Sequence, residues 1–304
     1  MAISRTQLVK ELEPGLNALF GLEYKRYENQ HAEIYVTESS DRAFEDEVML
    51  SGFANAQTKA EGSGVAFDSA QETYTARYTH DTIALAFAIT EEAIEDNLYD
   101  RISSRYTKAL ARSMSNAKQV KAVTPLIDGL PSTDSFDSGD GVSLFNTAHT
   151  TVSGTNVKNT LTTQADLNET SLEQSLIDIA AMTDERGLRI AARGVKIIVP
   201  SANQFTAERL MKSQGRTGTA DNDINAIGSM GMIPQGYRVN NYLTDSDAFY
   251  IITDVPNGMK MFQRAPLKTA MEGDFDTGNV RYKARERYSF GVSDYRGIFG
   301  VEGA

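Results

Sequence analysis

The sequence predicts an elongated α+β protein rather than a compact globule. Three observations predict this shape: a long hairpin over residues 48–89, a long helix over 90–124 and an alternating strand over 280–292. At 1.5 Å per residue the helix would be about 50 Å long. A compact chain of this length would itself be only about 50 Å across. A helix that would cross the entire molecule therefore favours an extended slab.

The composition allows a folded core and excludes several classes of protein. The 304 residues contain no Cys, which excludes disulfides, Cys-ligated metal centres and thiol nucleophiles. The formal net charge of −11 argues against a surface built entirely to grip nucleic acid. No apolar run approaches the roughly 18 residues that span a bilayer, and MAISRTQLVKELEPG lacks the apolar region of a secretory signal. We therefore expect a soluble protein made inside a cell, with no membrane partner.

Residues 1–47 predict an N-terminal arm without a core of its own. Leucine and phenylalanine recur at helical spacing between residues 8 and 20, and Pro14-Gly15 interrupts this pattern. We expect two short helical pieces with a break at Pro14-Gly15. Because short helices are marginal when isolated, the arm should pack on another surface.

Residues 48–89 predict a long β-hairpin with its tip at 55–64. The tip sequence NAQTKAEGSG consists of turn-formers and polar residues apart from two Ala. The returning arm leads into IALAFAI (83–89), where large apolar residues alternate with Ala, and this period of two is typical of a strand. A lone two-stranded hairpin is marginal in water, so its stability should come from a surface on which it lies.

Residues 90–124 predict one long helix that ends at Thr124-Pro125. Thr90 is a good N-cap, and apolar residues keep the 3.6-residue period throughout. Acids, including Glu91 and Glu92, come first and bases follow, an order that complements the helix macrodipole. A coiled coil is the alternative, but the single apolar stripe lacks the sustained heptads that a coiled coil requires.

Residues 125–256 predict mainly a small α/β unit, because short apolar runs alternate with helical patterns and turn-rich loops. The expected elements are, in order, a loop region with short strands (125–168), a helix that stops at Gly187 (170–186), a buried strand (195–200), a helix capped by Ser201 or Asn203, a Gly-rich loop (213–233) and two strands, YRVNNYL and AFYIITD.

Residues 257–292 predict long strands, and residues 293–304 a C-terminal strand. In 280–292 apolar residues alternate with cations, and only Glu286 departs from the apolar face. At about 3.3 Å per residue this strand would be about 43 Å long. The row of cations comprises Arg281, Lys283, Arg285 and Arg287. Three interpretations remain open: an exposed face that discourages edge pairing, a contact with acidic surface of a neighbouring subunit, or a contact with packaged nucleic acid.

The sequence predicts no catalytic, cofactor or metal site, and hence no enzyme. His31, His80 and His149 are far apart, and none has metal-ligand spacing. No nucleophile elbow, P-loop or dinucleotide-binding motif is present, and DSFDSGDG (134–141) fails the EF-hand pattern. We expect His149 to be a hydrogen-bonded loop residue.

A further set of candidate contact residues lies in the hairpin and at the start of the long helix. Lys59 and Glu61 lie at the predicted tip, Arg77 lies on the returning arm, and Glu91 and Glu92 open the helix. By default they are ordinary turn, strand and helix-start residues. As subunit-interface residues they require a partner.

Four segments, taken in order, carry a resemblance to a known family: AFAITEEAIEDNLYD (86–100), GVSLFNTAHTTVSG (141–154), LRIAARGVKIIVPSANQFTAERLMKS (188–213) and NGMKMFQRAPLKTAMEGDFDTGNVRYKARERYSFGVSDYRGIFG (257–300). Over nearly the whole chain, the order and spacing of the elements resemble the major capsid proteins of tailed phages with the HK97-type fold. The Mu-type major head subunit family is the most similar.

The resemblance implies a division of the chain into the parts of an HK97-type subunit. These parts are the N-terminal arm (1–47), the extended hairpin or E-loop (48–89), the spine helix of a peripheral domain (90–124), mainly the axial domain (125–256), the peripheral-domain strands (257–292) and a C-terminal strand (293–304).

The resemblance also implies a function without enzymatic turnover. Many copies would assemble as hexamers and pentamers into an icosahedral shell that encloses double-stranded DNA bound non-specifically. The implied partners are a scaffold, a portal and, in some systems, a decoration protein. Because the arm begins at once, the scaffold would be a separate protein or a removed segment. The location would be the virion, after synthesis in the host cytoplasm.

Two alternatives to this function remain open at the level of sequence. An encapsulin-like cellular nanocompartment would use the same fold for a different cargo. An α/β enzyme would use residues 160–260 as its catalytic domain. Some relatives form Lys–Asn crosslinks, and Lys59 lies at the hairpin tip, but no matching Asn or catalytic acid is identified, so no crosslink is predicted.

Overall fold

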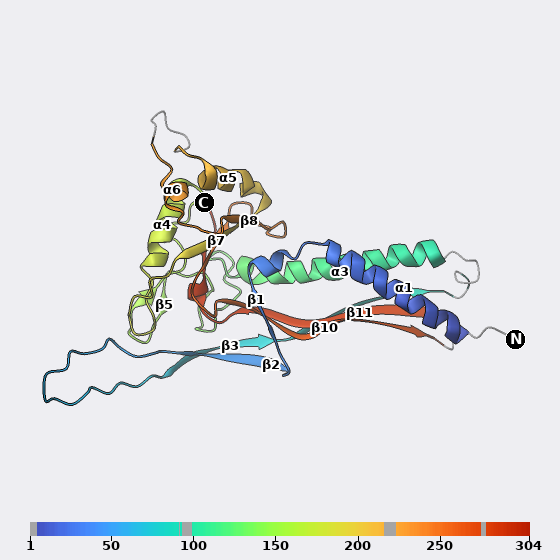
Figure 1. The fold of residues 1–304 in the computed structure, drawn as a ribbon, viewed down its shortest axis with the longest axis horizontal. Helices are drawn as coiled ribbons and strands as arrows, with labels where there is room; N and C mark the ends of the chain where they lie inside the picture. Colours follow the sequence, from blue (N-terminus) through green and yellow to red (C-terminus); the bar gives the residue numbers. More distant parts are fainter. Residues whose placement is uncertain (1–4, 91, 93–98, 216–222, 275–277) are drawn as a thin grey trace.

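The molecule is a long slab that carries a small α/β unit at one end, and a hairpin extends beyond that unit (Figure 1). The computed structural model describes residues 5–90, 92, 99–215, 223–274 and 278–304. The elongated shape agrees with the prediction made from the long helix and the long strand. The fold is mixed α+β, as predicted.

The slab is built on a four-stranded sheet whose central strands are unusually long. The strand order is β1-β10-β11-β4, and β11 runs antiparallel to both of its neighbours, whereas β1 runs parallel to β10. The bounds of β11 match the predicted strand 280–292. The four strands are β1 (Val36–Ser39), β10 (Met259–Gly273), β11 (Val280–Val292) and β4 (Asp81–Ile89).

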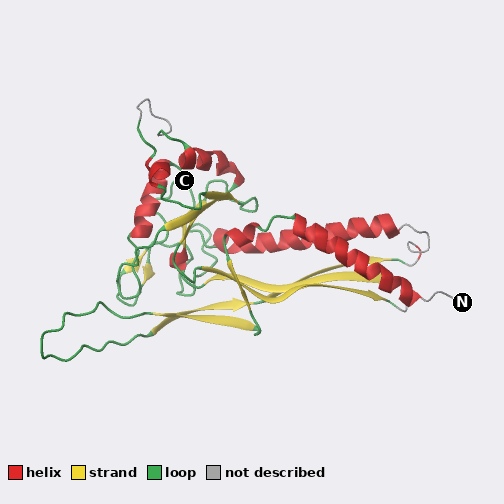
Figure 2. Ribbon diagram, in the orientation of Figure 1, coloured by secondary structure: helices red, strands yellow, loops and turns green. Residues whose placement is uncertain are grey.

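Two long helices lie along one face of this sheet, α1 (Arg5–Arg26) and α3 (Tyr99–Asp128) (Figure 2). Along the middle of β11 buried side chains alternate with the cations, and two of them, Tyr282 and Ala284, belong to the core beneath the helices. The ring of Phe20 from α1 lies 6.4 Å from that of Tyr282. The opposite face of β11 carries the predicted row of cations.

The predicted break in the N-terminal arm is wrong, because α1 is one continuous helix that contains Pro14. Proline removes a backbone hydrogen bond and costs a helix interior about 3 kcal/mol. Leu16 and Phe20, which follow it, are buried against α3 and the sheet. Each such side chain contributes about 1.5–3 kcal/mol on burial, enough to keep the helix whole. The surface on which this helix packs is therefore its own chain.

The long helix also continues past its predicted end at Thr124-Pro125. It ends at Asp128, with Pro125 inside it. The last turn is held by tertiary contacts, since Leu126 is fully buried and its carbonyl accepts a hydrogen bond from Tyr250 Oη. Most of the predicted first turn, including Glu91, lies outside the described residues.

The second sheet belongs to the α/β unit and has the order β12-β9-β7-β8. Its strands carry the core that joins the unit to the inner end of the slab. The C-terminal strand predicted over 293–304 is β12 in this sheet. The strands are β7 (Gly194–Val199), β8 (Tyr237–Val239), β9 (Phe249–Thr253) and β12 (Ile298–Val301), and the helices are α4 (Glu169–Ala180), α5 (Gln204–Lys212) and α6 (Ala226–Met230).

Three predictions in this unit need correction. The helix expected over 170–186 ends at Ala180, because the chain then forms a turn closed by a bridge between Thr183 and Arg189. Neither Ser201 nor Asn203 caps α5 through its side chain, since both lie in a short 3-10 helix, Ser201–Asn203. The loop expected over 213–233 contains α6. Further short elements are two 3-10 helices, Gln30–Glu33 and Tyr295–Gly297, and the small pair β5 (His149–Thr150) and β6 (Asn156–Val157).

The hairpin differs from the prediction at its base. Its strands are β2 (Phe44–Leu50) and β3 (Glu72–Thr79), paired antiparallel, so it begins before residue 48. Residues 51–71 between them form no strand. The segment IALAFAI lies in β4 and pairs with β11, so it belongs to the slab. The alternation identified a strand, but a period of two does not identify its partner.

Candidate assembly interface

Five cations line one groove on the sheet face that the helices leave open. The predicted row on β11 is joined there by two cations from β10, which the sequence analysis missed. The register of β10 against β11 shifts between Gln263 and Lys268, so the cations of β10 do not alternate simply. The lining residues are Arg264, Ala265, Pro266, Lys268, Thr269, Ala270, Lys283, Arg285 and Arg287.

The four cations of the predicted row are not equivalent. Arg281 forms a salt bridge with Asp274 at 2.5 Å and lies opposite Glu272 on β10. Lys283 and Arg285 are exposed, and no carboxylate among the described residues forms an ion pair with either. Arg287 is half-buried at the inner end of the groove. The outermost charge is therefore neutralised within the chain, whereas the middle of the row is not.

The base of the hairpin covers the inner end of the same sheet face. Tyr78 Oη lies 2.6 Å from Ser293 Oγ, and His80 Nδ1 lies 3.0 Å from Ser289 Oγ. Gly291 makes this contact possible, because a Cβ there would lie 2.6 Å from the Tyr78 ring. Burial, together with the positive charges of two nearby arginines, lowers the pKa of His80. The hairpin base is thus fixed to its own slab.

The outer part of the hairpin exposes large apolar side chains that the sequence analysis did not single out. Phe67 is 99% exposed and is accompanied by three further exposed apolar residues, Leu50, Phe53 and Val65. Exposed apolar groups gathered on one element mark an interaction surface. Their signal in the sequence is an apolar residue on each side of the polar tip.

The predicted hairpin contact residues differ in their surroundings. Lys59 and Glu61 are exposed at the tip, as expected. Arg77 instead makes two hydrogen bonds to Asp46 on the paired strand, at 2.7 and 2.8 Å, and its guanidinium lies over the Phe44 ring. Arg77 therefore stabilises the hairpin itself. Glu92 is exposed, and Glu91 lies outside the described residues.

One ion pair is buried between the long helix and the sheet. Lys118 Nζ lies 3.3 Å from Glu286 Oε2, and the Glu286 side chain is fully buried. Burial raises the pKa of Glu286, although the charge of Lys118 acts in the opposite direction. Glu286 is the one acidic residue on the apolar face of the strand, and Lys118 of α3 explains its presence there by supplying the opposite charge.

His149 is hydrogen-bonded as expected, but it lies in the short strand β5 rather than in a loop. Its Nδ1 lies 2.6 Å from Asp140 Oδ2, its Nε2 lies 3.1 Å from Asn159 Oδ1, and its ring stacks on Tyr295. Burial alone would raise the pKa of Asp140, but hydrogen bonds from His149 and Ser138 lower it. The imidazole is fully buried, so it joins Asp140 to Asn159 inside the fold and cannot meet a substrate.

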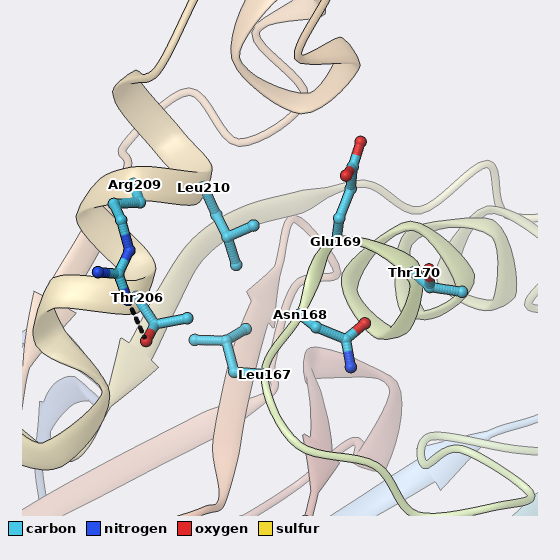
Figure 3. A pocket seen from close by; sticks show the side chains of 7 residues that line it. All are labelled: Leu167, Asn168, Glu169, Thr170, Thr206, Arg209 and Leu210. Atoms are coloured by element: carbon cyan, nitrogen blue, oxygen red, sulfur yellow. Dashed lines mark hydrogen bonds between the residues drawn. The ribbon is translucent and has the colours of Figure 1, made fainter. Parts of the chain in front are cut away.

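A surface pocket lies between α4 and α5 in the α/β unit (Figure 3). Asn168 at its rim accepts a hydrogen bond from the Ser171 backbone as the cap of α4, and Arg209 donates to Thr206 on its own helix. These polar groups serve the helices that carry them. Within the described part of the chain, no cluster of acidic or histidine side chains could hold a metal ion. No described helix is both long and apolar enough to cross a bilayer.

Solved structures with a similar architecture include a phage procapsid, a second phage structure and a virus-like particle. The procapsid subunit of bacteriophage JBD30 aligns with a TM-score of 0.55 and 13% identity, over 99% of this chain and 77% of that one. The structure from Mycobacterium phage Patience aligns with a TM-score of 0.55 and 11% identity, over 99% of this chain and 89% of that one. The virus-like particle from Pyrococcus furiosus aligns with a TM-score of 0.51 and 8% identity, over 94% of this chain and 98% of that one. At these identities the likeness establishes the fold, which is the HK97-type capsid fold.

The family follows from the sequence itself. A search of curated proteins found no match, but the family model described as phage capsid protein matches residues 72–301. Because this match covers most of the chain, the protein belongs to the phage capsid protein family. It is a structural protein that builds a phage capsid shell, and the alternative of an α/β enzyme over residues 160–260 is set aside.

Proposed function

We propose that this chain is the major head subunit of a tailed phage of the Mu type, and that it assembles as hexamers and pentamers into an icosahedral shell. The observation that carries the proposal is the hairpin, whose outer part exposes Phe67 and its apolar neighbours while its base is fixed to the slab. A monomer gains nothing from apolar groups held in water. An adjoining copy that covered them would gain their burial.

The proposed parts of the subunit follow the HK97-type plan, with boundaries adjusted to the structure. The hairpin proper comprises β2, β3 and the segment between them, and β4 joins the peripheral domain. We assign the axial domain mainly to residues 125–256 with β12 added to its sheet. The arm, 1–47, includes α1, which packs on its own spine helix.

The proposed contacts with adjoining copies lie on three parts of the surface. Lys59 and Glu61 contribute from the hairpin tip, Glu91 and Glu92 from the start of the spine helix, and the basic row from the open face of the sheet. Contacts of an extension with a body are heterologous, and such contacts close into rings and shells. Arg77 contributes indirectly, because it stabilises the hairpin.

The proposed partners follow from the family. The shell would enclose double-stranded DNA without sequence preference, and a separate scaffold, a portal and, in some systems, a decoration protein would complete it. The subunit would be made in the host cytoplasm and reside in the virion. The acidic balance of the chain suits this role, since a surface that repels phosphate lets DNA be packed and released.

Electron microscopy of the purified chain, alone and co-expressed with a scaffold, tests the proposal. We expect rings, sheets or shells from the wild type and a large loss of particles when residues 55–64 are deleted. The far-ultraviolet circular dichroism and unfolding midpoint of the deleted chain should stay unchanged, because these residues form no strand and lie outside the core. A strictly monomeric wild type at high concentration, with scaffold present, would refute shell assembly.

The second candidate function is an encapsulin-like compartment. One observation bears on it: a virus-like particle from a cellular organism, Pyrococcus furiosus, has a similar fold. The two functions differ in what the shell holds. Particles isolated from the natural source with packaged DNA would support the phage head, and particles that hold a protein cargo instead would support the compartment.

A further inference from the structure

The groove on the open face of the slab contains an unbalanced positive charge. None of its lining residues is acidic, and five of them are cations. Lys268 lies directly opposite Arg285 in the register of β10 and β11, so both side chains extend from the same face. Like charges placed directly opposite each other destabilise a sheet. The isolated subunit therefore carries a cost that a bound anion would remove.

Two buried atoms in the groove also lack partners. Arg264 Nε and Arg287 Nε are shielded from solvent, and no hydrogen-bond acceptor among the described residues reaches either of them. Buried donors are normally paired, and leaving one unpaired is costly. Both arginines lie at the inner end of the groove, beside the exposed Lys268 and Arg285. The groove thus offers hydrogen-bond donors and positive charge, so the ligand that fits it is an anion with hydrogen-bond acceptors.

Two other cations on this sheet face, Lys260 and Arg281, already have partners, and these partners are carboxylates. At the inner end, Lys260 Nζ lies 2.7 Å from Glu47 Oε1 of the hairpin and 3.2 Å from Glu38 Oε1 of β1. At the outer end, Arg281 takes Asp274. Both ends of the face are therefore neutralised by carboxylates, and the cations between them are left without any.

The dimensions of the groove favour an extended polypeptide over duplex DNA. It lies over two adjacent strands, which are about 4.8 Å apart. Alternate residues along a strand repeat at about 6.6 Å, which is also the spacing of the cations on β11. The chain has 41 acidic against 30 basic residues, so a second copy offers surplus carboxylates, whereas its net charge of −11 opposes the approach of DNA.

We propose that this groove receives an extended acidic segment of a second copy of the chain, whose carboxylates pair with Lys268, Lys283 and Arg285. The proposal rests on the assembly proposed above. It adds Arg264 and Lys268 to the basic row. Of the two partners considered for this row, a neighbouring subunit and packaged nucleic acid, it favours the neighbouring subunit.

Zero-length carbodiimide crosslinking tests the partner, since it joins lysine amines to carboxylates in direct contact. Particles assembled from a mixture of ¹⁴N- and ¹⁵N-labelled subunits should give crosslinks from Lys268 and Lys283 to Asp or Glu of a differently labelled copy, and dissociated subunits should not. Crosslinks confined to one copy, or no crosslinks at all, would overturn the proposal. So would lysines protected from acetylation only in DNA-filled particles, which would indicate DNA as the occupant.

The variant Lys268→Glu separates the groove from shell assembly in general. In the isolated subunit it should raise the unfolding midpoint, because it places a carboxylate opposite Arg285. In assembly it should lower particle yield at least tenfold, since the groove loses charge. Lys108→Glu, the same charge change on the exposed side of α3, is the control and should leave particle yield within twofold of the wild type.

A subunit measurement keeps the groove testable even if no particles form. A hexaglutamate peptide should bind the wild-type subunit saturably at low salt and bind Lys268→Glu at least tenfold more weakly. Equal binding to both would overturn the groove as a carboxylate site. Failure of the wild type to assemble, with normal peptide binding, would instead count against the proposed function.

Discussion

His31 shows how one residue couples the arm to the long helix. Its backbone N–H donates to Gln119 Oε1 at 2.9 Å, and its ring packs edge-on against Phe290. The side chain is nearly fully buried, and its Nδ1 has no partner among the described residues. Burial, followed by the nearby charge of Lys118, lowers the pKa of His31 to about 4. The folded state therefore holds this imidazole neutral.

This environment predicts a loss of stability in mild acid. The pKa of His31 is lower in the folded chain than the ordinary value near 6.5, so the unfolded chain binds the proton more readily. The stabilising contribution is present above pH 6.5 and is lost as the pH falls toward 4. A shift of this size corresponds to about 3 kcal/mol. Urea unfolding from pH 7 to 4 should show the loss, and His31→Gln should flatten this part of the profile; an unchanged slope would contradict it.

The pair of Lys118 and Glu286 predicts a second effect at the residue scale. Lys118→Ala leaves the buried Glu286 carboxyl without its counter-charge, and removing one partner of a buried pair costs about 3–5 kcal/mol. Replacing both residues, as in Lys118→Met with Glu286→Leu, should cost much less, because no charge is then left buried. Chemical unfolding of both variants measures the difference. Equal losses would show that the pair is not coupled.

The continuous helix α1 carries the prediction at the scale of an element. Pro14 is exposed and lies inside the helix. Pro14→Ala restores the missing backbone hydrogen bond and removes the steric clash, so it should stabilise the subunit by up to about 3 kcal/mol. The helical signal in circular dichroism should stay the same, since the helix is already continuous. A large rise in helical signal would show that the wild-type helix is broken at this point.

The elements show which features of the fold the sequence could predict. Local patterns were sufficient to predict two strands, β11 from its alternation of apolar residues and cations and β7 from its short apolar run. They failed at Pro14 and Pro125, because tertiary burial of Phe20 and Leu126 outweighs the local effect of proline. Local patterns also could not show which strands pair with each other. The partner of IALAFAI and the approach of Lys268 to Arg285 depend on contacts between residues far apart in the chain.

The candidate interface was predictable in part for the same reason. Four cations at a period of two identify a basic strand face, and the polar tip of the hairpin identifies its turn. The apolar groups beside that tip were not recognised, because Phe53 and Phe67 follow no periodic pattern that separates an exposed residue from a buried one. Only the structure shows that no part of the described chain covers them.

At the scale of the whole molecule, the chain shelters its arm and leaves its hairpin uncovered. The helix α1 buries Leu16 and Phe20 on the slab, and the hairpin base is fixed by Tyr78 and His80. The outer hairpin exposes Phe67, the most exposed of the large apolar side chains that the structure describes. Arg186 holds it near the α/β unit through a hydrogen bond to the Ser69 carbonyl at 2.5 Å and a salt bridge to Asp68 at 3.6 Å. Self-association should therefore depend on the hairpin more than on the arm.

Phe67→Ser tests this conclusion without altering the length of the hairpin. The side chain is 99% exposed, so its loss should leave the unfolding midpoint of the isolated subunit unchanged. A contact that buries one Phe side chain contributes about 1.5–3 kcal/mol, so each hairpin docking should weaken by about tenfold or more. Light scattering during assembly should show a higher threshold concentration for particles. Leu22→Ser, at an exposed apolar position on α1, is the matched control. Equal thresholds for the two variants would place the association surface elsewhere than on the hairpin.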